Sequence, residues 1–159
     1  MALISDLRIR ERVWYHSYRF RRAATAPLAS LGRDPVDARI ALVTSAGLHQ
    51  PADSPFVREK GGDWSYRVIP GTIAPSALVC THPSRAWDRS GVEQDANVAF
   101  PLDRLRELAG DGTIGDCAPR HISFQGSITA PGRLVSRTAP EIADIFRTDR
   151  VDGVVMAPV

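Results

Sequence analysis

The chain has 159 residues, of which 43% are hydrophobic and 24% charged, and its formal net charge is +2. These values are typical of one globular domain with a proper core, and so small a net charge gives no argument for binding nucleic acid. No apolar run reaches the length of about 18 residues that a transmembrane helix needs, and charges interrupt the N-terminal stretch. Two cysteines make no disulfide framework. We therefore expect a cytoplasmic protein.

The N-terminal segment is predicted to form an amphipathic helix over residues 3–18, with arginines between its apolar positions. Proline and glycine then mark an irregular link. We place a helix and linker at residues 1–37 and an α/β domain at residues 38–159. The apolar residues at roughly helical spacing are Leu3, Leu7, Trp14 and Tyr18.

Unbroken apolar runs predict two buried strands. Residues 39–44 contain one such run, which is typical of a strand covered on both faces in a parallel sheet. Residues 151–157 show the same pattern and are predicted to form a second buried strand of that sheet. Shorter strands are predicted at residues 64–69 and 77–80, because these stretches alternate or carry short apolar runs.

Two helices are predicted to cover the sheet. Residues 101–109 have a proline in the first turn and Leu102, Leu105 and Leu108 on one face. Residues 139–147 form the second helix, which a capping box beginning at Thr138 is predicted to open. The order of elements indicates an α/β fold, with a mainly parallel sheet covered by helices.

Reactive side chains concentrate in residues 80–88 and 117–126. Three histidines, His49, His82 and His121, are predicted to lie in loops that flank strand ends. Histidine is the side chain most easily poised for proton transfer near neutral pH. Because ligands of open α/β sheets bind at the carboxyl ends of strands, we expect these histidines to flank a pocket.

Two other interpretations of the same residues stay open. Cys80, His82, Cys117 and His121 supply the ligand types that zinc prefers, although their spacing is not that of the usual cysteine pairs. Alternatively, Cys117 is a nucleophile with His121 as its base. The neighbouring Asp116 disfavours a thiolate at Cys117.

Several segments between residues 38 and 159 together carry a family pattern. They resemble the selenoprotein B family, which comprises the B subunits of glycine, sarcosine and betaine reductase and the small subunit of D-proline reductase. The segments are Val43-Thr-Ser-Ala-Gly-Leu-His49, Pro55-Phe56, Asp63-Trp-Ser-Tyr-Arg-Val-Ile-Pro70, Asp95-Ala-Asn-Val-Ala-Phe-Pro-Leu-Asp-Arg-Leu105, Gly112-Thr-Ile-Gly115 and Pro119-Arg-His-Ile-Ser-Phe-Gln-Gly126.

The resemblance implies a dithiol-dependent reductase that cleaves a C–N bond of an amino acid or amine. In the family, a strand like residues 151–159 leads into a redox motif that begins with selenocysteine or cysteine. We therefore expect the nucleophile after Val159, a C-terminal part that this chain lacks, and no turnover by the chain alone. The resemblance also implies an oligomer, a partner subunit that can carry a pyruvoyl group, and no cofactor or metal on this chain.

The pocket is then expected at the strand ends. His121, with His82, is the candidate proton donor to the leaving amine, and Arg120 would hold a substrate carboxylate in a bidentate pair. The carboxyl end of the last strand should open on the same side, with apolar surface exposed beside it. The remaining substrate-binding candidates are His49, Arg85, Asp88 and Ser123. The rival hypothesis is a small non-enzymatic α/β binding module that holds zinc through the four residues named above.

Overall fold

A computed structural model describes residues 4–18, 29–84 and 87–159, and the chain divides into two units, residues 1–30 and 31–159. In the first unit, a 3-10 turn (η1, Ile4–Asp6) precedes helix α1 (Ile9–Ser17). The predicted helix is therefore shorter than expected, and it buries none of its residues. Trp14 remains 59% exposed, and its ring centroid lies 5.0 Å from that of Tyr18, with the two ring planes tilted by 33°.

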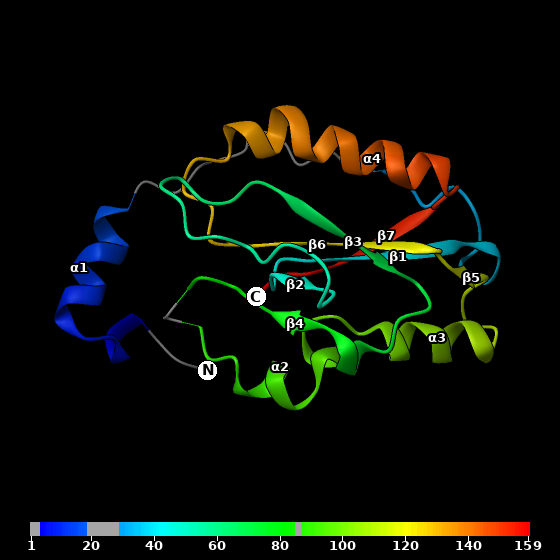
Figure 1. The fold of residues 1–159 in the computed structure, drawn as a ribbon, viewed down its shortest axis with the longest axis horizontal. Helices are drawn as coiled ribbons and strands as arrows, with labels where there is room; N and C mark the ends of the chain where they lie inside the picture. The colour runs from blue at the N-terminus through cyan, green and yellow to red at the C-terminus, as the bar shows by residue number, and fades with distance from the viewer. Residues whose placement is uncertain (1–3, 19–28, 85–86) are drawn as a thin grey trace. The chain divides into compact units, whose positions relative to one another are not determined.

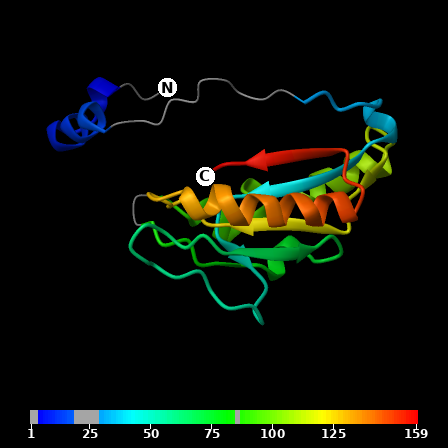
Figure 2. The same ribbon diagram turned by 90° about the horizontal axis from the view of Figure 1, so that it is seen from above.

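The second unit is built on a mixed sheet with a parallel centre. Strand β1 (Arg39–Thr44) pairs in parallel with β7 (Gly153–Ala157) on one edge. On its other edge it pairs in parallel with two strands in succession, first β5 (Asp116–Cys117) and then β6 (Arg120–Phe124). Strand β3 (Tyr66–Pro70) runs antiparallel to β6. Figure 2 shows β7, β1, β6 and β3 side by side in that order.

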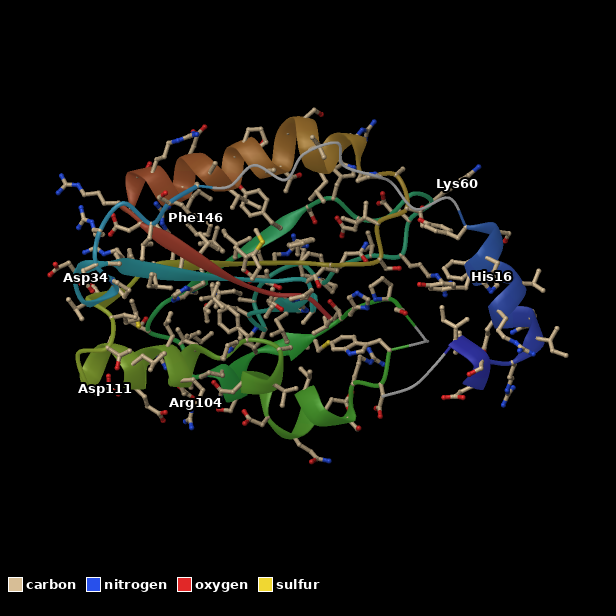
Figure 3. The ribbon with its side chains drawn as sticks, turned by 180° about the vertical axis from the view of Figure 1, so that it is seen from behind. His16, Asp34, Lys60, Arg104, Asp111 and Phe146 are labelled. Atoms are coloured by element: carbon tan, nitrogen blue, oxygen red, sulfur yellow. The ribbon has the colours of Figure 1, made fainter. Side chains whose placement is uncertain are left out.

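Helices cover both faces of this sheet, as the sequence predicts (Figure 1). On one face, Ile40 and Leu42 of β1 pack in a cluster with Leu102 and other residues of helix α3 (Leu102–Gly110). On the other face, alternate β1 residues pack against Phe146 of helix α4 (Ala139–Thr148), which points toward the sheet in Figure 3. Each buried side chain of this size contributes roughly 1.5–3 kcal/mol, so these two clusters hold the layers together.

Strand β7 differs from its prediction. The parallel pairing with β1 is confirmed, but β7 is not buried, since Val155 is 46% and Met156 73% exposed. Among the described residues, only β1 pairs with β7, so its outer edge is open. A short apolar run indicates a strand but does not tell a central strand from an edge strand. The expectation of exposed apolar surface beside this strand is confirmed.

The predicted capping box at the start of α4 is wrong. Thr138 is already helical, because a π-helical turn (η5, Leu134–Thr138) runs directly into α4. The Thr138 hydroxyl instead donates to the carbonyl oxygen of Trp64 at 2.6 Å, a contact between distant parts of the chain. The side chain therefore fastens α4 to the segment before β3.

A smaller layer completes the unit on the α3 side. A two-stranded antiparallel sheet of β2 (Leu48–His49) and β4 (Val79–Cys80) lies there. None of the described helices is long and apolar enough to cross a bilayer. The remaining short elements are η2 (Pro35–Asp37), η3 (Pro75–Ala77), α2 (Ser90–Gln94) and η4 (Ala96–Val98).

Candidate functional site

The carboxyl ends of the three long parallel strands are tied together. Ser45, just after β1, accepts a hydrogen bond from Gly126 after β6, and its hydroxyl accepts one from the N–H of Val159 at 3.0 Å. The N–H of Gly47 donates to the carbonyl of Phe124 at 2.9 Å. Segments that follow β1, β6 and β7 therefore meet at one edge of the sheet, where α/β proteins place their ligands.

The most unusual feature near this edge is a buried polar stripe formed by His121 and Ser123 of β6 and by Gln125, which directly follows β6. These alternate residues share one face of the strand, and all three are 0% exposed. Within the described part of the chain, His121 Nε2, Ser123 Oγ and both amide atoms of Gln125 have no hydrogen-bond partner. Buried polar atoms are normally paired, so an unpaired stripe requires an explanation.

A cavity of about 390 Å³ lies at the end of this stripe, and Gln125 lines it. That volume falls within the range of ligand pockets. Its walls come from three separate segments that continue beyond the strand ends. The lining residues are Arg58, Glu59, Gly62, Pro83, Ser84, Gln125, Ser127 and Thr129. We call this the Gln125 cavity.

Two walls of the Gln125 cavity are clamped together by backbone contacts. The carbonyl of Gly61 accepts hydrogen bonds from the N–H groups of Thr129 and Ala130, each at 3.0 Å. Gly62 has a φ of +100°, and a Cβ there would lie 2.7 Å from the Cα of Ile128. Glycine at this position therefore permits both the left-handed backbone and the close approach.

Asp63 secures the loop that carries Arg58 and Glu59. Its carboxylate accepts from the N–H of Val57 at 3.1 Å and from the N–H and hydroxyl of Ser65. Burial alone would raise the pKa of Asp63, but these hydrogen bonds outweigh burial and hold its pKa below the usual value. The ionised carboxylate of Asp63 therefore holds this loop in place, and we call it the charged anchor of the loop.

The predicted site histidines differ in position and tautomer. His49, in β2 rather than a loop, donates from Nδ1 to the carbonyl of Gln50 at 2.7 Å, and its buried Nε2 has no partner among the described residues. His82 accepts at Nδ1 from the N–H of Ser84, so its unpaired Nε2 carries a proton. Burial, with a contribution from Arg89, lowers the pKa of His82.

His121 lies inside β6 and not in a loop, so its predicted location is wrong. Its Nδ1 accepts a hydrogen bond from the backbone N–H of Leu42 at 2.9 Å, so the side chain takes the role that a backbone carbonyl usually has. Its ring packs edge-on against Phe100. Burial, assisted by the charge of Arg106, lowers the pKa of His121 to about 4. The imidazole is therefore neutral at neutral pH.

The structure does not bring two of the remaining predicted residues, Arg120 and Asp88, to the cavity. Arg120 begins β6, at the opposite end from Gln125, and its guanidinium is held by the Asp149 carboxylate in two bonds of 2.8 and 2.7 Å. The exposed Asp88 accepts from the N–H of Ser90 at the start of α2, which lowers the pKa of Asp88. Arg85 lies outside the described residues. The roles predicted for these side chains stay predictions.

Neither cysteine is placed as an activated thiol. Cys80 Sγ lies 3.3 Å from the carbonyl oxygen of Ala46, to which it donates. Burial, and then the charge of Asp116, raise the pKa of Cys117. Cys80, His82, Cys117 and His121 are all described, and no three of them gather as metal ligands. The four-ligand zinc site of the rival hypothesis is therefore not formed.

A second cavity, of about 500 Å³, lies beside β4, α2 and α3. Three of its polar lining residues, Asn97, Asp103 and Arg106, pair with one another and with neighbouring backbone. Arg106 donates to Asp103 and to the carbonyls of Gly71 and Ile73, and the Asn97 side chain bonds with Asp103. This network fastens α3 to neighbouring loops, so we assign it a structural role.

The family model for glycine/sarcosine/betaine reductase selenoprotein B matches residues 7–159. The chain belongs to this family. It is 38% identical over 120 residues to D-proline reductase subunit gamma of Acetoanaerobium sticklandii, covering 76% of this chain and 48% of that protein. It is 33% identical over 102 residues to sarcosine reductase complex component B subunit beta of Peptoclostridium acidaminophilum, covering 63% of this chain and 23% of that protein.

The chain therefore spans about half the length of the first of these selenoprotein B relatives and about a quarter of the second. Both are named as components of reductases, so the family is one of oxidoreductase subunits. No solved structure matches the chain. The buried polar stripe and its cavity thus belong to a chain of this family.

Proposed function

We propose that this chain forms the substrate-binding part of a dithiol-dependent reductase that cleaves a C–N bond of an amino acid or amine. The observation that carries the proposal is the Gln125 cavity at the carboxyl edge of the parallel strands, because the buried amide of Gln125 has no hydrogen-bond partner among the described residues. Substrates of the relatives suggest D-proline, sarcosine and related amines as candidates. In the reaction, the C–N bond breaks and a dithiol supplies two electrons as it is oxidised to a disulfide. One proton goes to the leaving nitrogen, and a second proton completes a new C–H bond on the carbon.

We propose that the nucleophile is neither Cys80 nor Cys117. A catalytic thiol needs a lowered pKa, whereas burial and Asp116 raise that of Cys117. The nucleophile is then a selenocysteine or cysteine outside these 159 residues, as the family resemblance implies. A partner subunit that carries a pyruvoyl group would complete the enzyme. Purified alone, the chain should show no dithiol-dependent turnover of D-proline or sarcosine, and turnover that Cys117→Ser abolishes would refute this assignment.

Among the histidines, we propose His82 as the proton donor and His121 as a positioning residue. His82 carries a proton on an unpaired Nε2 and directly precedes Pro83 and Ser84, which line the Gln125 cavity. A bound carboxylate would raise the pKa of His82, which burial and Arg89 lower. His121, with a pKa of about 4, holds Leu42 instead.

The test uses the complete reductase complex carrying His82→Asn. Asparagine keeps an acceptor close to the position of Nδ1 for Ser84 but cannot transfer a proton. We expect turnover to fall about 100-fold or more while substrate binding changes little, which is the usual size of a general-acid contribution. The matched control is His16→Asn, on the exposed face of α1. Unchanged turnover in His82→Asn would reject the role.

A further inference from the structure

The side-chain amide of Gln125 specifies what its ligand must offer. Nε2 is a donor and Oε1 an acceptor, both are buried, and neither has a partner among the described residues. Leaving such groups unpaired destabilises the folded chain unless a ligand completes them. The ligand that fits therefore presents an oxygen acceptor and an N–H donor next to each other.

Two charged residues at the rim of the Gln125 cavity match the same kind of ligand. Arg58 and Glu59 are consecutive, exposed and opposite in sign, and both line the cavity. A guanidinium suits a carboxylate, and a carboxylate suits a protonated amine. The amide of Gln125 and the two charged rim residues thus both match a compound that carries a carboxylate close to a nitrogen bearing hydrogen.

The lining also lacks what a quaternary ammonium group requires. Proteins hold such cations on the faces of aromatic rings, because a fully methylated nitrogen has no hydrogen to donate. None of the described residues that line the cavity is aromatic. A quaternary nitrogen would therefore leave Oε1 of Gln125 unpaired and gain no ring contact in exchange.

We propose that the Gln125 cavity selects carboxylate-bearing amines that carry at least one N–H and rejects quaternary ammonium compounds, with Gln125 as the residue that determines this specificity. The inference rests on the proposed function, since it names the class of amine for the same site. A site built to bond an N–H discriminates against the analogue that lacks it, because the buried acceptor is left unpaired.

Calorimetric titration of the purified chain with sarcosine, D-proline and glycine betaine tests the inference. We expect saturable binding of the first two and at least about 10-fold weaker binding of betaine. Gln125→Leu should remove the preference by weakening the N–H amines. The matched control is Gln94→Leu, an exposed glutamine that lines the second cavity, and it should leave the preference unchanged.

The melting temperature of Gln125→Leu gives a readout that a structural role would not produce. Replacing an unpaired buried amide by an apolar side chain of similar size should raise the melting temperature of the ligand-free chain, by roughly 3 °C. A glutamine that mainly supports the fold would instead lower it. Stabilisation together with lost binding is therefore the expected signature.

The possible outcomes separate this inference from the proposed function. Equal binding of betaine and sarcosine, no saturable binding of any of the three, or an unchanged preference in Gln125→Leu would each overturn the inference. If discrimination is found but the complete complex reduces none of these amines, the inference stands and the proposed function fails. If the complex reduces an amine and Gln125→Leu changes no preference, the function stands and the inference fails.

Discussion

Replacement of His121 by asparagine should remove a pH-dependent part of the stability of the fold. Folding lowers the pKa of His121 from 6.5 to about 4, because the ring is buried and the positive charge of Arg106 lies nearby. Its Nδ1 accepts the N–H of Leu42. As the pH falls, the unfolded histidine takes up a proton near its ordinary pKa, whereas the folded one stays neutral until about pH 4. The neutral form is the one that folds, so its stabilisation is complete above the unfolded pKa and is lost as the pH falls through this window.

The size of this effect follows from the shift. The lowering from 6.5 to about 4 spans some 2.5 pH units, and each unit corresponds to about 1.4 kcal/mol. His121 should therefore account for a decrease of about 3 kcal/mol in the free energy of unfolding between about pH 7 and about pH 4. Asparagine retains an acceptor for Leu42 close to the position of Nδ1 but does not titrate.

Urea unfolding of the wild type and of His121→Asn, followed by circular dichroism across this pH range, measures the difference. Acidic groups common to both proteins cancel in the comparison, and so does the constant loss of ring packing against Phe100. The variant should be less stable at neutral pH, with the gap closing or reversing as the pH falls. Parallel curves for the two proteins would refute the assignment of a neutral, Nδ1-accepting His121.

Three further outcomes are expected. Gly62→Ala should cost about 1–3 kcal/mol, because its φ of +100° and the backbone of Ile128 at 2.7 Å both oppose a side chain, and limited proteolysis should then cut the loop faster. Asp63→Asn should lower the free energy of unfolding by about 2 kcal/mol at neutral pH. Because the pKa of Asp63 is lowered, this difference should disappear as the pH falls through its folded pKa, and persistence in acid would contradict the charged anchor. Cys117 should react slowly with iodoacetamide at neutral pH, and Asp116→Asn should speed the reaction by lowering the pKa of the thiol.

The sequence predicts those elements whose buried side chains are apolar. Strand β1 is predicted within its observed bounds, because its unbroken apolar run is typical of a strand covered on both faces. Helix α3 follows the same logic, with Leu102 and Leu105 buried, although Leu108 is 40% exposed near its end. Pattern and environment agree at these positions.

Strand β6 shows why the site itself was harder to predict. Its residues alternate between polar and apolar, a pattern that normally indicates one face in water. Here the polar face is buried, so His121, Ser123 and Gln125 lie in the interior. Arg120 was predicted to bind substrate because the sequence does not reveal its partner, Asp149, which is 29 residues away. The signal that could have indicated the stripe is the alternation of polar and apolar residues in β6, because this strand lies between two loops rich in glycine or proline.

The pairing of β1 with β7 also has a consequence for how the chain folds during synthesis. Thr44 and Ala157 are 113 residues apart in the sequence, yet they are adjacent in the sheet. At a translation rate of about 5–20 residues per second, roughly 6–23 s pass between the synthesis of the two strands. During that interval, one edge of β1 has no partner and is open to pairing with other chains. The fold therefore depends on late, long-range closure, which makes it slow and leaves the nascent chain in need of protection.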